Sequence, residues 1–386
     1  MAARTPPKPA RKVGAEPGAA APSTHEGRHL QPPGWALQAT AALADAGARV
    51  RVIAANTPMN LRRELTRLER AWRSSGAAEP HFTYEPPPDH GRLREVLDAI
   101  ADELATQGEL GEIYAGRARE LADDAALCET AGTAGLWAAA RRRYARRDRF
   151  DADADATADV WLAERSPGPG ADAEEPAVRS DDERSPHSLV SRLRQEIGRR
   201  RLPLRVVIKD NLASLAATGD GFVQVIAGRP LSVRDVERTV LHEIAGHVEP
   251  RVVASSARLG IFVLGTARGS DDQEGRALVL ERAAGFLDLA RRREIALRHV
   301  AARSIEARAD FVATARLLLG RGASIEAALR IAARAHRGGG LGREAVYLPA
   351  LLRVEAAVAA DGGIDRVLGA GRVAVDAAPA LRAWVD

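Results

Sequence analysis

The segment His242-Glu243-Ile-Ala-Gly246-His247 constrains the fold more than any other part of the chain, because it places two imidazoles and an acid on one predicted helix. Two imidazoles with a nearby carboxylate are typical ligands of a catalytic zinc ion. The common helical motif spaces its histidines four residues apart, on one face. A spacing of five leaves them roughly 140° apart on a regular helix. A π-bulge would return both to one side, and Gly246, which lacks a Cβ, is where the turn widens most easily.

A catalytic zinc site also needs a third protein ligand and an open position for water. The acidic start of a later helix, Asp271-Asp272-Gln-Glu274, offers a candidate. We expect Glu274 to be the ligand, since a second helix carries a glutamate in the glutamate-type zincins. The alternative is a first-turn glutamate that favours the helix dipole. Asp271 and Asp272 are predicted to cap this helix. Glu281 lies seven residues after Glu274, on the same face, and would orient a ligand histidine or form a surface ion pair.

Glu243, between the two histidines, is the predicted general base. Its carboxylate would take a proton from a metal-activated water, whose pKa falls to about 7, and pass it to the leaving amine. The alternative is that His242 and His247 are ordinary helix residues, one facing solvent and one hydrogen-bonded in the core. The second acidic motif downstream favours the metal site.

Two segments resemble the signatures of a known family. His242–His247 and Gln273–Ala277 are similar to the two motifs of the family that contains the bacterial QEGLA-motif proteins and the eukaryotic microtubule-associated tyrosine carboxypeptidases. The resemblance covers roughly residues 36 to 385. Its other similar stretches are Ala55–Leu61, His81–Tyr84, Val207–Ala213, His336–Gly338 and Val346–Leu348.

This resemblance implies a zinc-dependent peptidase of the HExxxH type, with His242, His247 and Glu274 as ligands and Glu243 as the catalytic acid and base. In the eukaryotic branch, the family removes a C-terminal tyrosine from tubulin. The chain departs from the family pattern at Arg276, where leucine is usual, and at Ala245-Gly246, where Gly-Thr is usual. These departures leave the ligand positions intact and bear on substrate and helix packing. Tubulin is therefore not carried over as the substrate.

Composition narrows the remaining classes. The 386 residues can bury a sizeable core, and the single cysteine, Cys128, cannot form an internal disulfide and suits a reducing compartment. Residues 1–34 are rich in Pro, Ala and Arg and contain no apolar core of a signal peptide, so we expect no secretory signal. Because no apolar run approaches 18 residues, we expect a cytoplasmic protein without a membrane span. The net charge is only +4 and aromatic residues are sparse. We therefore expect no nucleic-acid partner, although a basic surface would favour an acidic peptide or tail.

The pattern of apolar and turn residues predicts an α+β protein that is predominantly helical, with a zincin-like catalytic core and a small β-sheet beside the active-site helix. Four regions are expected. They are a disordered leader (1–34), a helical N-terminal part of the catalytic domain (35–164), a flexible acidic Pro/Gly loop (165–186) and a zincin-like metallopeptidase core (187–386).

Several elements are predicted within these regions. Helices are expected after Asn60, where leucines and Trp72 recur at helical spacing, and over 274–290 and 305–319. Ser232 is the expected N-cap of the histidine helix. Strands are expected at 204–208 and 222–226, and the second is predicted to be an edge strand that holds the substrate backbone by strand addition.

Three further residues are candidates for the substrate site. Tyr347 would donate a hydrogen bond to the oxyanion of the tetrahedral intermediate, or it is a half-buried core tyrosine. Arg337 precedes three glycines and would bind a substrate carboxylate through its planar fork, or it is a helix C-terminal arginine beside a glycine cap. Lys209 is a second candidate for the carboxylate.

The sequence thus predicts a zinc metallopeptidase, carboxypeptidase-like, that hydrolyses peptide bonds near the C-terminus of a peptide or protein. One alternative is a zinc endopeptidase or amidohydrolase that uses the same site on another substrate. Another is a non-catalytic regulatory protein in which the metal is structural or absent and the basic surface binds an acidic partner.

Overall fold

Helices dominate the structure, and the few strands form small sheets, so the predicted α+β, predominantly helical class is confirmed. The computed structural model describes residues 30–144, 148–164, 177–219 and 221–385. Residues 32–386 form one compact unit. No helix in the described part of the chain is both long enough and apolar enough to cross a membrane.

The predicted leader and acidic loop lie only partly within the described residues. Residues 1–29 and 165–176 fall outside them. The described end of the acidic loop is ordered by pairing, because β1 (Val178–Arg179) runs antiparallel to β5 (Pro230–Leu231). Ser180, directly after β1, is fully buried and its hydroxyl donates to the Ile226 carbonyl.

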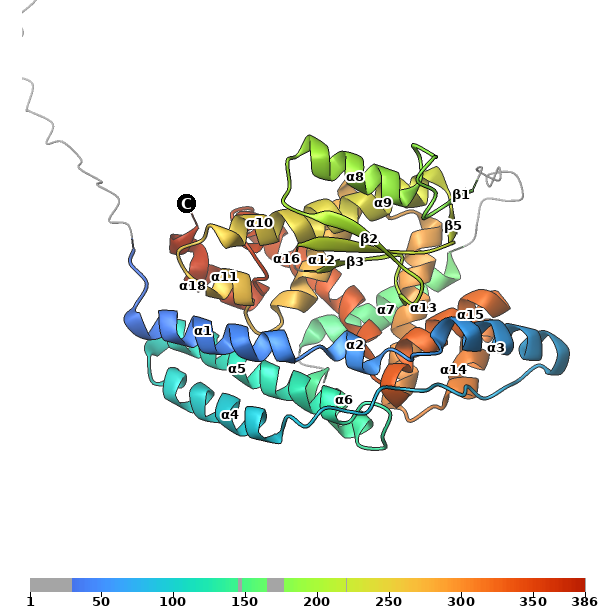
Figure 1. Cartoon of the computed structure of the whole chain (residues 1–386), viewed down its shortest axis with the longest axis horizontal. Helices are drawn as coiled ribbons and strands as arrows, with labels where there is room; N and C mark the ends of the chain where they lie inside the picture. Colours follow the sequence, from blue (N-terminus) through green and yellow to red (C-terminus); the bar gives the residue numbers. More distant parts are fainter. Residues whose placement is uncertain (1–29, 145–147, 165–176, 220, 386) are drawn as a thin grey trace, which may run out of the picture. The chain divides into compact units, whose positions relative to one another are not determined.

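The described N-terminal region is helical, and α3 shows why. Leu61, Leu68 and Trp72 are buried along one face, and the left-handed Gly76 ends the helix. The helix predicted after Asn60 is therefore confirmed. Helices α4 and α5 pack side by side (Figure 1). The helices are α1 (Gly34–Arg49), α2 (Val52–Asn56), α3 (Leu61–Ser75), α4 (Gly91–Ala105), α5 (Gly108–Glu129), α6 (Leu136–Arg143) and α7 (Arg149–Ala163).

A three-stranded sheet lies beside the histidine helix. Its strands are β2 (Arg205–Lys209), β3 (Ala216–Gly219) and β4 (Phe222–Ile226), in the order β2-β4-β3. β4 pairs parallel with β2 and antiparallel with β3. The prediction that 222–226 is an edge strand is therefore wrong. The preceding segment forms β3, which pairs with the side of β4 that β2 leaves free, so β4 is the central strand. β2 and β3 are the two edge strands, and β3 is the one that packs against the histidine helix.

The histidine helix is continuous through three segments, α9 (Val233–Leu241), η1 (His242–Val248) and α10 (Glu249–Ser255). Ser232 caps it as predicted, since its Oγ accepts a hydrogen bond from the Asp235 N–H at 3.0 Å. Helix α8 (Leu189–Arg199) packs alongside α9 and on β2 (Figure 1). This packing fixes the histidine helix against the sheet.

The rest of the described chain consists of short and long helices. They are α11 (Ile261–Leu264), α12 (Gly269–Ala283), α13 (Leu289–Glu306), α14 (Phe311–Gly320), α15 (Ile325–Ala335), η2 (Arg337–Gly339), η3 (Arg343–Val346), α16 (Tyr347–Ala360), α17 (Ile364–Leu368), η4 (Val375–Ala377), α18 (Ala378–Leu381) and η5 (Arg382–Trp384).

Two predicted helices have different boundaries in the structure. The helix expected over 274–290 ends at Ala283, because Gly285 adopts a left-handed φ of 77° and Asp288 caps a new helix, α13. The helix expected over 305–319 begins later in the structure, as α14, at Phe311. Asp310 caps it, since its side chain accepts a hydrogen bond from the Ala313 N–H.

The two aspartates at the start of α12 do not cap it, and this prediction is wrong. The N-cap position is Arg268, which has a left-handed φ of 61° and provides no side-chain cap. Asp271 and Asp272 are buried and turned toward arginines of other helices. Arg143 donates to Asp271 at 3.3 Å, and Arg353 donates to Asp272 at 2.9 Å. Their charges are used in ion pairs that tie α12 to α6 and α16.

Candidate metal centre

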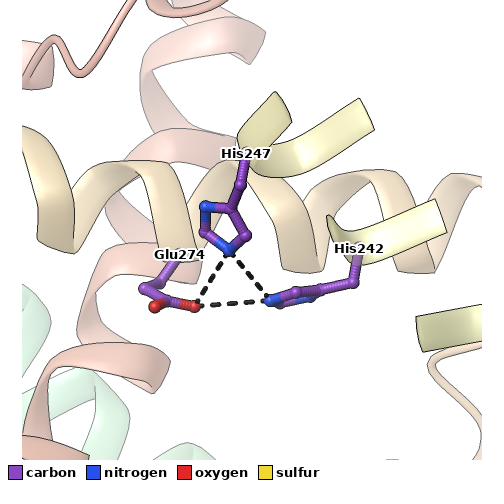
Figure 2. Close-up of side chains that lie close together, drawn as sticks. All are labelled: His242, His247 and Glu274. Atoms are coloured by element: carbon purple, nitrogen blue, oxygen red, sulfur yellow. Dashed lines mark hydrogen bonds and ion pairs between the residues drawn. The ribbon is translucent and has the colours of Figure 1, made fainter. Parts of the chain in front are cut away.

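The turn that carries the two histidines is a π-helix, as the five-residue spacing predicts. η1 spans His242–Val248 and widens the helix between α9 and α10. The extra residue in the turn brings both imidazoles to one side, and their Nε2 atoms lie 3.2 Å apart. Figure 2 shows both rings directed at the same point.

Gly246 has a second role that the sequence did not reveal. A Cβ at this position would lie 2.6 Å from the Cβ of Ala277 on α12, well inside van der Waals contact. The missing side chain therefore allows α12 to pack closely against the π-turn. This close approach matters because α12 carries Glu274 one turn before Ala277.

Glu274 completes a cluster of three potential ligands with His242 and His247. Its Oε2 lies 3.4 Å from the Nε2 of His242 and 3.6 Å from the Nε2 of His247 (Figure 2). Ligand atoms about 2.0–2.1 Å from a tetrahedral zinc ion are separated from one another by about 3.3 Å. The three observed separations therefore fit a zinc ion, and the structure brings all three predicted ligands together.

The outer nitrogens of both rings are held by oxygen atoms. Nδ1 of His242 lies 2.7 Å from Oε1 of Glu281, and Nδ1 of His247 lies 3.1 Å from Oε1 of Gln273. Because these oxygens accept hydrogen bonds, each Nδ1 carries the proton and each Nε2 presents a lone pair. Two lone pairs and the Glu274 carboxylate converge at one point, which a positive charge would stabilise.

The ionisation of the cluster follows from the same contacts. Burial alone would lower the pKa of His242, but its hydrogen bonds to Glu274 and Glu281 raise that pKa to about 10. Burial would raise the pKa of Glu274, yet the neighbouring His247 and His242 hold it well below its usual value. A proton or a divalent cation can supply the positive charge that these groups favour.

Glu281 orients His242 from the interior of the protein. Its side chain is fully buried, so the surface ion pair considered for it is wrong. Arg291 donates to both of its oxygens, at 2.8 and 2.9 Å. Burial alone would raise the pKa of Glu281, but Arg291 and His242 lower it to about 2. Glu281 is therefore an ionised acceptor that is fixed in place on two sides.

Glu243 is buried and lies toward the sheet. Its Oε2 accepts a hydrogen bond from Oγ1 of Thr218, on the edge strand β3, at 2.8 Å. No charged side chain of the described residues forms an ion pair with it. Glu243, the predicted base, thus directly follows His242 in the sequence, and its carboxylate is held by the neutral hydroxyl of Thr218.

Arg343 joins Glu274 to Tyr347, and no motif in the sequence distinguishes it from the many other arginines. It donates to Oε1 of Glu274 at 3.3 Å and to the hydroxyl of Tyr347 at 3.2 Å. The Oε1 contact leaves Oε2 of Glu274 directed at the histidines. A second arginine, Arg334, donates to the Tyr347 hydroxyl at 3.3 Å. Tyr347 is buried, as a core tyrosine would be, yet its hydroxyl is linked to the cluster through one side chain.

The two predicted carboxylate binders have different surroundings. Arg337 is 3% exposed, and its Nε has no hydrogen-bond partner among the described residues. Burial and the neighbouring Arg334 lower the pKa of Arg337 to about 10. Lys209 is exposed at the end of β2, and β4 separates β2 from β3, the strand beside the histidine helix. Lys209 makes no hydrogen bond or ion pair with the clustered side chains. The structure thus does not bring Lys209 to the site.

A family model described as microtubule-associated tyrosine carboxypeptidase matches residues 69–386. The matched residues include η1, α12 and the segment from Arg337 to Tyr347, so every side chain of the cluster lies within them. No curated protein matches the chain.

Proposed function

The chain belongs to the microtubule-associated tyrosine carboxypeptidase family, and from this premise we propose that it is a zinc-dependent metallopeptidase that cleaves near the C-terminus of a peptide or protein. The observation that carries the proposal is the convergence of the Nε2 atoms of His242 and His247 with Oε2 of Glu274 at separations of 3.2 to 3.6 Å. These residues would hold the zinc ion.

When bound, zinc would polarise the scissile carbonyl and make a water molecule acidic at neutral pH. Glu243 accepts a proton from the attacking water and passes it to the leaving amine. Tyr347 donates to the carbonyl oxygen as negative charge develops there. A hydroxyl has two acceptor lone pairs and one donor. Arg334 and Arg343 occupy both lone pairs of Tyr347, so its proton is available to the substrate.

Arg337 would bind the free α-carboxylate of the substrate. Glu344, the acid among the described residues that acts on Arg337, already accepts hydrogen bonds from Arg298 at 2.6 Å and Arg334 at 2.8 Å. Positive charge therefore exceeds negative charge around Arg337, and a buried guanidinium is costly without an anion. A terminal carboxylate would supply that anion, and the same charges favour an acidic substrate tail.

The edge strand β3 would hold the substrate backbone. The Ile226 N–H donates to the Leu215 carbonyl, which puts this pair in a hydrogen-bonded position of the antiparallel ladder. By alternation, the backbone groups of Ala216 and Thr218 point away from β4, toward the open edge. An extended peptide can pair with them there.

A cavity of about 400 Å³ would take the side chain of the C-terminal residue. It borders the Arg343 segment at Gly342 and Ala345, and its walls include Trp137, Tyr144 and Leu341. The apolar and aromatic part of these walls, which also carry Arg141 and Glu306, favours an apolar or aromatic side chain. We also propose a cytoplasmic location, because the single cysteine is a free thiol and suits a reducing compartment.

Mass spectrometry of peptide-library products, with and without a chelator, tests the proposal. Peptides with free and amidated C-termini should be compared, since only a free carboxylate can bind Arg337. We expect cleavage of the free-acid peptides and loss of that cleavage with the chelator. Glu243→Gln should abolish turnover, whereas Glu237→Gln on the preceding helix is the matched control and should not.

Each alternative predicts another pattern. Equal cleavage of amidated peptides, or cleavage at internal bonds, would indicate an endopeptidase or amidohydrolase. Purified protein without stoichiometric zinc, or unchanged hydrolysis in the Glu243→Gln variant, would refute the enzyme and leave a regulatory protein.

A further inference from the structure

Among the polar side chains at the sheet edge, Thr218 is the one that reaches the predicted base. Its Oγ1 donates to Oε2 of Glu243 at 2.8 Å. We propose that Thr218 is a positioning residue for Glu243, and that it couples this base to the strand on which the substrate backbone lies. The inference rests on the proposed function and deepens it.

The position of Thr218 follows from the register of the sheet. Side chains alternate along a strand, so Ala216 and Thr218 face the same side. Ala216 is buried in the core with Ile244 and Val240 of the histidine helix, which shows that this side faces the helix. The Thr218 backbone, however, points to the open edge of β3. One residue therefore contacts the base through its side chain and would contact the substrate through its main chain.

Glu243 has few other restraints on its orientation. It is 6% exposed, so water satisfies little of its hydrogen-bonding capacity. The other acids of the site are held by arginines, as Glu274 is by Arg343 and Glu281 is by Arg291. A hydroxyl fixes one carboxylate oxygen without adding a positive charge beside it. The second oxygen of Glu243, Oε1, accepts no hydrogen bond from the described residues and is available to the attacking water.

The test compares two substitutions in the full chain. Thr218→Val keeps the shape and the strand preference but removes the hydroxyl, whereas Thr218→Ser keeps the hydroxyl. We expect kcat to fall about 10- to 100-fold in Thr218→Val with little change in KM, and to recover in Thr218→Ser. Thr239→Val is the matched control, because that buried threonine donates only to its own helix, at the Asp235 carbonyl.

Two readouts besides activity separate positioning from a general loss of structure. The zinc content per chain and the Tm of the metal-free protein should be the same in Thr218→Val as in the wild type. If zinc or Tm falls together with kcat, Thr218 is a structural residue and the inference is overturned. Where valine perturbs packing, Thr218→Ala removes the hydroxyl without added bulk and is judged by the same criteria.

The outcomes distinguish this inference from the proposed function. Wild-type turnover in Thr218→Val, beside an inactive Glu243→Gln variant, would overturn the role of Thr218 and leave the peptidase intact. Absence of peptide hydrolysis in the wild type would overturn both. A kcat loss that Thr218→Ser restores, at constant zinc content, supports both.

Discussion

Replacing Gly246 by alanine is expected to open the metal centre. The added Cβ would lie 2.6 Å from the Cβ of Ala277, whereas two carbons in contact lie about 3.5–4.0 Å apart. The methyl group of Ala277 cannot rotate away, so η1 and α12 must separate by roughly 1 Å. Glu274 lies on the same helix, one turn before Ala277, and would move with it. Its Oε2 starts 3.6 Å from the Nε2 of His247.

Two opposing effects set the size of the change in stability. Overpacking costs about 1–3 kcal/mol, while alanine in place of glycine within a helix contributes about 0.5–1 kcal/mol. The net loss of unfolding free energy in the metal-free protein is therefore about 0–2.5 kcal/mol. Zinc affinity should fall more clearly, by roughly 10- to 100-fold, because the ligand set is distorted directly.

Competition with a chelating dye measures this affinity. Gly246→Ala combined with Ala277→Gly removes the colliding methyl group and should restore most of the zinc affinity. Gly198→Ala is the matched control, because a Cβ at this position on α8 meets no atom within 4 Å. Wild-type zinc affinity in Gly246→Ala, or no recovery in the double variant, would refute the role assigned to the close contact.

Three further results are expected. Glu344→Ala leaves the buried Arg298 and the half-buried Arg334 without their shared acid, so urea denaturation should show a loss of about 3 kcal/mol. The pKa of Glu281 is lowered to about 2, so its stabilising effect is complete above about pH 4.5 and is lost as the pH falls toward 2. The unfolding free energy of Glu281→Gln should therefore fall less between pH 4.5 and 3 than that of the wild type. Removal of zinc by a chelator should lower the Tm measured by scanning calorimetry, and a Tm unaffected by chelator would contradict a bound metal.

The helices could be predicted because their signals are local. The buried face of α3 repeats every three to four residues, and Ser232 caps the histidine helix in a recognisable pattern. The strand β3 could not be predicted, because Ala-Ala-Thr-Gly contains only one β-branched residue and has little strand preference of its own. Pairing with β4 makes it a strand. The strand next to the histidine helix at the sheet edge is therefore β3 and not the more strand-like 222–226 segment.

The predicted metal ligands share this local character, since the π-turn follows from a spacing of five and Glu274 from a short acidic motif. Their partners do not. Arg343 and Thr218 reach the site through tertiary packing, from η3 and β3, and nothing in their neighbouring residues distinguishes them from other arginines and threonines. Contacts between distant segments leave no pattern in a single sequence.

The way these partners are arranged implies a site that is organised before the metal binds. Arg291 fixes Glu281 with two hydrogen bonds, and Glu281 in turn fixes the ring of His242. Arg343 holds the outer oxygen of Glu274 and so turns the inner one toward the histidines. Since these restraints come from Arg291 on α13, Glu281 on α12 and Arg343 on η3, the ligand geometry depends on the fold as a whole and not on the ion. Zinc binding should therefore change the Tm without changing the far-ultraviolet circular dichroism spectrum, whereas a site assembled by the metal would gain helix signal on addition of zinc.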